Sequence, residues 1–185
     1  LSAYGGILLL DILSKWASKR KLLLIYSSIL LVFLIFFLED YIYHAPKSAA
    51  PAMLYGRGEA VEFVRSVEDR YPEIVFSRSL SEPQIFIAFY NQWDPADYQK
   101  EAKDWLRYEG AGFPFVDQLG EYRLGKYVFS DINFEKYKTK SGPLLVGKPN
   151  EFPQNVAAIK TIHYPKGAPA ILIVDPTAQV YAKAH

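Results

Sequence analysis

The most continuous apolar run in the chain extends from Leu22 to Leu38 and reads LLLIYSSILLVFLIFFL. Its 17 residues carry no charge, and a bilayer-spanning α-helix needs about 17–25 such residues. Tyr41 and Tyr43 follow the run, and aromatic rings at this point are typical of a membrane–water interface. The pattern therefore predicts a transmembrane helix over residues 22–40.

A second apolar stretch, LSAYGGILLLDIL, opens the chain and contains one charged residue, Asp11. It is too short to cross a bilayer alone, so we interpret residues 1–14 as the end of a preceding transmembrane helix. An ionisable residue within a membrane segment is a functional hypothesis by default. Asp11, however, lies four residues before Lys15 and near the helix end, where interfacial water is within reach. We favour this second interpretation.

Charged residues on the two sides of the long apolar run predict its orientation. Glu39 and Asp40 follow the run, and four basic residues precede it: Lys15, Lys19, Arg20 and Lys21. Because an excess of Lys and Arg marks the cytoplasmic side, residues 15–21 are expected to form a cytoplasmic loop and residues 41–185 to be extracytoplasmic in the cell membrane. The basic residues could also bind lipid phosphates, but topology alone explains them.

A secretory signal peptide is the alternative interpretation of the same region. A basic segment, an apolar run and small residues at 48–52 occur in the required order. The apolar part of a signal peptide is, however, only about 7–15 residues long and lies close to an initiating Met. The chain begins instead at Leu1 with further apolar sequence, so a transmembrane helix is favoured.

The remaining sequence predicts a linker followed by one folded domain. Residues 41–53 include the Pro/Ala-rich stretch HAPKSAAPA, which has no periodicity, so we assign them to a linker and residues 54–185 to the domain. Gly58 to Tyr71 then shows helical periodicity, and its apolar face comprises Ala60, Val64, Val67 and Tyr71. Glu73 to Arg78, after a helix-stopping Pro72, favours a strand.

Two further helices are expected in the middle of the domain. Ser81, with Gln84 three residues on, fits a capping box ahead of the apolar segment IFIAFY, for which we expect a buried helix. Asp94-Pro95 is a second helix start, and Gly110 is its stop. The apolar face of this second helix comprises Tyr98, Ala102, Trp105 and Tyr108.

Strand patterns dominate the rest of the domain. The expected strands are Tyr122–Ser130, Pro143–Val146, Ala158–Tyr164 and Ala170–Val174. The last two flank Pro165 to Pro169, a turn-forming run that favours a hairpin. The sequence thus predicts an α/β (α+β) domain with a mixed sheet, and it leaves the strand order open.

Composition excludes several classes of function. The net charge of +1 gives no general attraction to nucleic acid, and the absence of cysteine rules out a thiolate metal site or a cysteine nucleophile. His44, His163 and His185 are scattered without the spacing that metal ligands show, so no metal site is expected. No phosphate-binding loop or nucleophile motif occurs, and no cofactor is expected in this chain.

Two groups of residues could bind an anion or a sugar. Gly56-Arg57-Gly58 precedes a helix and could hold a phosphate through Arg57, although glycine there is more often simple turn chemistry. Four aromatic residues could stack on sugar rings, although at helical spacing such residues more often belong to the core. They are Tyr90, Trp93, Tyr98 and Trp105. Trp93 is the best exception, because it lies in a loop between Gln92 and Asp94.

The order of these segments resembles the C-terminal part of bacterial membrane glycosyltransferases of the dolichyl-phosphate-mannose–protein mannosyltransferase type, a group that includes the lipid A aminoarabinose transferase. The resemblance covers nearly the whole chain. It rests on a KRKLLL turn, the last membrane helix, the exit LEDYIYHAP, and then YGRGEAVEFV, EIVFSRSLSEPQIFIAFYNQWDPADYQKEA, YVFSDINF, LLVGKPNEFP and IKTIHYPKGAPAILIVDP.

The resemblance implies a polytopic parent protein that uses a polyprenyl-phosphate-linked sugar donor and an extracytoplasmic acceptor. The family's catalytic acidic residues lie in its first extracytoplasmic loop, so catalytic residues are expected outside this chain. Glu39 and Asp40 are an acidic pair at the corresponding membrane face, but they match the end of the last helix and more simply mark the membrane exit. The expected partners are the lipid bilayer and the N-terminal transmembrane portion.

Two other functions are considered beside this one. The chain could be a non-enzymatic, membrane-tethered binding module of the cell envelope, which would have neither further membrane helices nor an acidic pair in a first outer loop. An anchored hydrolase is disfavoured, because no nucleophile–base set stands out in the sequence. Because the catalytic residues are expected outside this chain, the isolated fragment is expected to lack transferase activity.

Overall fold

The chain folds into two compact units, Leu1–Ser48 and Ala49–His185. The computed structural model describes residues 2–13, 15, 18–138 and 142–177. We call the first part the N-terminal helical unit and the second the α/β unit. The side chain of Asp11 and all of His185 lie outside the described part of the chain.

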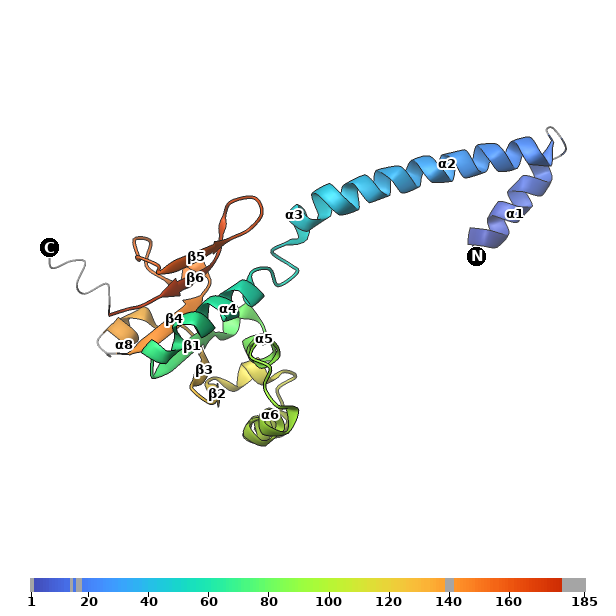
Figure 1. Ribbon diagram of the computed structural model, residues 1–185. Helices are drawn as coiled ribbons and strands as arrows, with labels where there is room; N and C mark the ends of the chain where they lie inside the picture. The colour runs from blue at the N-terminus through green and yellow to red at the C-terminus, as the bar shows by residue number, and fades with distance from the viewer. Residues whose placement is uncertain (1, 14, 16–17, 139–141, 178–185) are drawn as a thin grey trace. The chain divides into compact units, whose positions relative to one another are not determined.

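The N-terminal helical unit contains α1 (Ser2–Leu13) and the long helix that begins with α2 (Lys19–Glu39) (Figure 1). The long helix passes through a π-helical turn, η1 (Asp40–His44), into α3 (Ala45–Ala49). Together Lys19–Ala49 form a helix of 31 residues, the only helix in the described residues that is long and apolar enough to span a membrane. None of the α2 side chains is buried by the described residues.

The Pro/Ala-rich stretch differs from the linker that its sequence suggests, because residues 45–49 are helical. Pro46 has no N–H to offer the carbonyl of Ile42, four residues earlier, and its ring would crowd that carbonyl in a regular α-helix. The wider π-helical turn immediately before it, Asp40–His44, accommodates this interruption. The helix ends at Ala49. In the turns that follow, the N–H groups of Ala52 and Met53 donate to the Ala49 carbonyl.

A six-stranded mixed sheet forms the centre of the α/β unit, which confirms the predicted mixed α/β fold. The strand order is β2-β3-β1-β4-β6-β5. β1 pairs in parallel with both β3 and β4, and the remaining pairs are antiparallel. The strands are β1 (Glu73–Ser77), β2 (Tyr122–Leu124), β3 (Tyr127–Ser130), β4 (Pro143–Gly147), β5 (Lys160–His163) and β6 (Pro169–Val174).

The single strand expected over residues 122–130 is wrong, because the structure divides it into β2 and β3. Gly125 between them has a φ of 57°, a left-handed conformation that glycine adopts without steric cost. Because strand-forming residues lie on both sides of the two-residue turn Gly125-Lys126, the sequence resembles one strand and does not reveal that the chain reverses direction there. The predicted hairpin at residues 165–169 is confirmed by the antiparallel pairing of β5 and β6.

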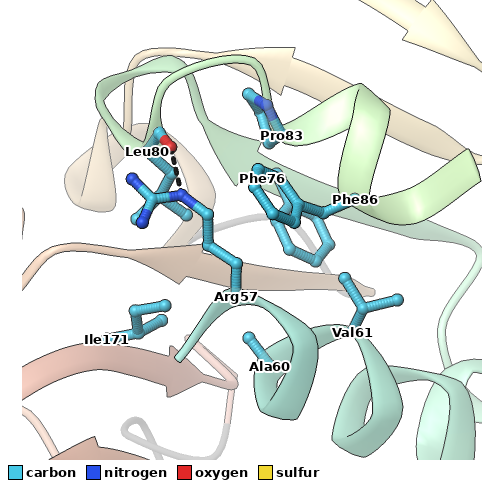
Figure 2. Close-up of a pocket in the computed structure, with 8 residues that line it drawn as sticks. All are labelled: Arg57, Ala60, Val61, Phe76, Leu80, Pro83, Phe86 and Ile171. Atoms are coloured by element: carbon cyan, nitrogen blue, oxygen red, sulfur yellow. Dashed lines mark hydrogen bonds between the residues drawn. The ribbon is translucent and has the colours of Figure 1, made fainter. Parts of the chain in front are cut away.

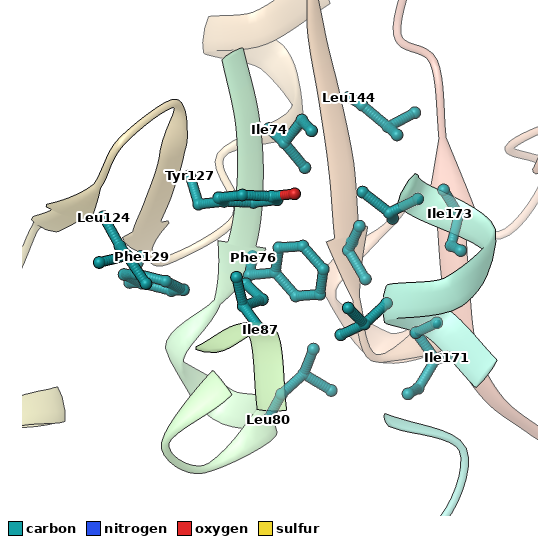
Figure 3. Packing of buried hydrophobic residues seen from close by; sticks show 14 of the residues in the cluster. Ile74, Phe76, Leu80, Ile87, Leu124, Tyr127, Phe129, Leu144, Ile171 and Ile173 are labelled. Carbon is teal, nitrogen blue, oxygen red and sulfur yellow. The ribbon is translucent and has the colours of Figure 1, made fainter. Parts of the chain in front are cut away.

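Alternate residues of the central strands supply two cores on opposite faces of the sheet. The larger core contains Ile74 and Phe76 of β1 together with Phe129, and it is covered by α4 (Arg57–Val67) and α5 (Pro83–Tyr90) (Figures 1 and 3). The smaller core contains Val75 and is covered by α8 (Phe134–Lys138). Strands buried on both faces explain why their sequences are continuously apolar.

The helix α4 (Arg57–Val67) is shorter than the expected Gly58–Tyr71, since a 3₁₀ turn, η2 (Glu68–Arg70), replaces its last part. Ala60, Val61 and Val64 are buried. After β1 comes η3 (Arg78–Leu80), followed by α5 (Pro83–Tyr90). The predicted capping box is wrong, because Ser81 ends η3 with a φ of 55° and the residue before α5 is Glu82, whose side chain makes no capping bond.

The predicted second helix begins at its expected cap, since the Asp94 side chain accepts from the Ala96 N–H at 2.7 Å. It is, however, interrupted: α6 (Pro95–Ala102) passes into η4 (Lys103–Leu106) and α7 (Arg107–Gly110). This change of helix type turns Trp105 into the core, where its Nε1 donates to the Arg123 carbonyl at 3.1 Å. Two further 3₁₀ turns are η5 (Val116–Leu119) and η6 (Pro149–Glu151).

Candidate functional site

The carboxyl ends of β1, β3 and β4 meet at one edge of the sheet, because these three strands are parallel. The chain leaves β1 for helices that pack on the larger core and leaves β3 for α8, which packs on the smaller one. Such a change of side is where open α/β sheets commonly bind ligands. Polar residues at this edge are therefore candidates for a binding site.

Between β1 and β4, this edge is filled by the carboxylate of Glu151. It accepts from the hydroxyls of Ser77 at 2.5 Å and Ser79 at 2.9 Å, and from the Lys148 N–H at 2.7 Å. Gly147 makes room for it, since a Cβ there would lie 2.8 Å from Glu151 Oε2. The donors that could hold an external anion are thus satisfied by the protein's own carboxylate, which gives this position a structural role.

Between β1 and β3, Arg78 connects the strand ends to the loop that follows α7. Its guanidinium donates to Asp131 Oδ2 at 2.6 Å and to the Asp117 carbonyl oxygen at 2.5 Å. Asp131 is 79% exposed, so solvent screens the ion pair itself. The bond to Asp117 has the clearer consequence, because it fixes η5 next to the beginning of α5.

Arg57, which the sequence offered as a possible anion ligand beside the favoured interpretation of simple turn chemistry, is buried (Figure 2). Its Nε donates to the Leu80 carbonyl at 2.6 Å, and its guanidinium carbon lies 5.7 Å from the centre of the Phe86 ring. Burial lowers the pKa of Arg57 from its ordinary value. The surrounding cavity, about 10 Å³, has room for about one water molecule and no larger ligand, so Arg57 joins α4 to η3.

An open hollow lies beside this arginine, where α5 begins, and we call it the α5 groove. Its volume is about 460 Å³. It is lined by Leu54, Ser81, Glu82, Ile85, Phe86, Phe115 and Asp117. Apolar side chains thus form its walls, and two carboxylates lie among them. Neither carboxylate has a hydrogen bond or ion pair with a residue that the structure describes.

Two neighbouring hollows extend the α5 groove along the outer surface of the helix. One, of about 280 Å³, shares Glu82, Ile85 and Phe115 with the groove. The other, of about 430 Å³, shares Ile85 and reaches Trp93. Ile85 lines all three hollows, which together form one surface, rich in apolar side chains, between Leu54 and Trp93.

Backbone strain is concentrated at the α5 groove. Three non-glycine residues that line it have positive φ angles: 56° at Leu54, 55° at Ser81 and 49° at Glu82. Each such conformation costs on the order of 1–3 kcal/mol and persists only where the surrounding structure imposes it. With this backbone conformation, Glu82 lines the groove. Glu82 also takes the position before α5 that the sequence predicted for Ser81.

The other residues singled out by sequence do not form a catalytic set. Glu39 lies 3.0 Å from His44 Nε2, and both it and Asp40 are exposed at the end of α2. Trp105 belongs to the core and Tyr98 packs edge-on against it, as the packing interpretation predicted. Trp93 is half-buried and lines the far end of the apolar surface. The described residues contain no group of three or more potential metal ligands.

Comparison with models of known protein families, with curated proteins and with solved structures found no match for this chain. Sequence reasoning missed the α5 groove, because its lining comes from three separate segments around residues 54, 81–86 and 115–117. One signal was available: the segment PQIFIAFY is apolar almost throughout, whereas a helix on one face of a sheet needs only one apolar side.

Proposed function

We propose that this chain is the C-terminal, extracytoplasmic accessory region of a polytopic membrane glycosyltransferase. The parent protein would transfer a sugar from a polyprenyl-phosphate-linked donor to an acceptor outside the cytoplasm. Its catalytic residues would lie upstream of this chain, and the α/β unit would support the membrane-embedded part.

The observation that carries the proposal is the direct junction between the bilayer-length helix and the α/β unit. Lys19–Ala49 has basic residues at its start, and the folded unit begins where it ends. With the basic flank in the cytoplasm, the α/β unit lies outside. The order of segments that resembles the glycosyltransferase family supports the same assignment.

The arrangement of polar groups is consistent with an accessory role. In the part of the chain that the structure describes, the Ser77–Ser79–Glu151 cluster is internally satisfied and no serine there is paired with a histidine base. The surface beside α5 offers apolar side chains and two carboxylates for contact with a partner, and these features suit binding better than catalysis. A tethered binding module without enzymatic function shares this property, and upstream membrane helices distinguish the two.

Transfer assays in membranes test the proposal. Membranes that contain the full-length protein should transfer sugar from a polyprenyl-phosphate donor, whereas purified residues 1–185 should show no turnover with the same donor. Turnover by residues 1–185 alone would contradict the proposal that the catalytic residues lie upstream of this chain. A mature protein that begins at Leu1 would refute the transferase assignment itself and favour the binding module.

A further inference from the structure

The outward side of α5 is an apolar surface without charge. The helix reads PQIFIAFY, and Ile85 and Phe89, one turn apart, are 49% and 74% exposed. Phe115, which is 58% exposed, extends the surface from the neighbouring loop. A contiguous apolar surface of this kind, next to polar groups, typically marks an interaction site. The α5 helix therefore presents two anchors, Ile85 and Phe89.

The charges beside these anchors indicate what kind of surface would cover them. Glu82 and Asp117 line the same groove, and neither carboxylate has an ion pair in the described part of the chain. Anionic lipid headgroups would repel these carboxylates, and transfer into hydrocarbon would remove their hydration at high cost. A protein surface with apolar side chains and a lysine or arginine is complementary to both features.

The groove is connected to the long helix by a short stretch of chain. Leu54, at the edge of the α5 groove, lies five residues after Ala49, where the long helix ends. Five residues span at most about 18 Å even when fully extended. A short segment therefore connects Leu54 to the end of the long helix, and a partner on the same polypeptide would have a high effective concentration.

We propose that the α5 surface docks against the extracytoplasmic side of the membrane-embedded part of the same polypeptide. Ile85 and Phe89 would be its anchors, and Glu82 and Asp117 would face a lysine or arginine of that part. The inference rests on the proposed function, because it needs membrane helices upstream of this chain.

Site-directed photocrosslinking in membranes tests the docking. Residues 1–185 contain no cysteine, so a benzophenone maleimide can be placed at Ile85→Cys in a cysteine-free full-length protein. Ile159→Cys is the matched control, since this isoleucine before β5 is 42% exposed, close to the value for Ile85. The probe at position 85 should give an intramolecular crosslink to a peptide upstream of Leu1, and the probe at 159 should not.

Two results would overturn the inference. One is a crosslink from position 85 to lipid alone, which would make the bilayer the partner. The other is an equal yield of intramolecular product at positions 85 and 159. Failure of the proposed function is detected separately, because it requires the absence of upstream membrane helices or of transfer activity.

Neutralising the two carboxylates tests the charge complementarity. The Glu82→Gln, Asp117→Asn protein should lose the crosslink from position 85 by at least about fivefold, because paired charges in a partly desolvated interface contribute on the order of 1 kcal/mol or more. Asp131→Asn is the control, since Asp131 is exposed and lies outside the groove. An unchanged yield in the double variant would exclude a cationic partner at this position.

Discussion

Replacing Phe129 with alanine should lower the free energy of unfolding of the α/β unit by about 3–5 kcal/mol. Phe129 is fully buried in β3, and its ring centre lies 4.8 Å from that of Tyr122 and 6.3 Å from that of Trp105. Its removal would leave a cavity between the sheet and the η4 segment, because a close-packed core relaxes only partly around a lost side chain. This is the largest effect that we expect from a single apolar substitution.

Chemical denaturation of residues 1–185 in detergent micelles, followed by near-ultraviolet circular dichroism, measures this change. Phe113→Ala is the control, because Phe113 is 42% exposed and its loss should change the free energy of unfolding by no more than about 0.5 kcal/mol. Equal effects at the two positions would contradict the assignment of Phe129 to the core.

Raising the pH above 10 should destabilise the α/β unit through two buried tyrosines. Burial raises the pKa of Tyr122 well above its ordinary value, and the charge of Asp117 raises it further. Burial also raises the pKa of Tyr127, and its hydrogen bond to Glu68 adds to the effect. In the folded unit both hydroxyls therefore stay protonated above pH 10.

The sign of the effect follows from where the protons are bound. The unfolded chain releases both tyrosine protons near the ordinary pKa of about 10, whereas the folded unit retains them. The stability that these groups contribute is complete below that pH and is lost as the pH rises toward the folded-state pKa values. The loss is at most about 1.4 kcal/mol per pH unit for each tyrosine.

Urea unfolding at pH 9 and pH 11 measures this loss. The Tyr122→Phe, Tyr127→Phe protein should be less stable at pH 9, because it lacks the bonds to Gln84 and Asn91, but it should change much less between the two pH values. An equal decline in the parent and the double variant would assign the alkaline sensitivity to other groups.

The sequence predicted the elements of the fold better than their ends. Apolar strands and the long apolar helix follow directly from uninterrupted hydrophobic runs, and the Asp94 cap follows from its own side chain. Ser81 fitted a capping box equally well, yet it ends η3, because the backbone before α5 takes two successive left-handed residues. Such a conformation is imposed by packing around Leu80 and Arg57, which no local pattern records.

The candidate site was harder to predict for the same reason. Arg57 was considered as a possible anion ligand, but tertiary contacts bury it against Leu80 and Phe86. The α5 groove depends on loops that are distant in sequence, and nothing near Asp117 indicates that Arg78 holds its backbone beside α5. Helical periodicity identifies a core-facing side, but an apolar outer side is recognised only when the packing is seen.

The α/β unit is proposed to lie on the extracytoplasmic side of the membrane, and cysteine labelling in intact cells tests this assignment. In a cysteine-free full-length protein, Lys166→Cys occupies the exposed turn between β5 and β6, and Ser18→Cys occupies the exposed start of the long helix. A membrane-impermeant maleimide should label position 166 in intact cells and position 18 only after the membrane is permeabilised. Labelling of position 166 only after permeabilisation would place the α/β unit in the cytoplasm and contradict its proposed extracytoplasmic location.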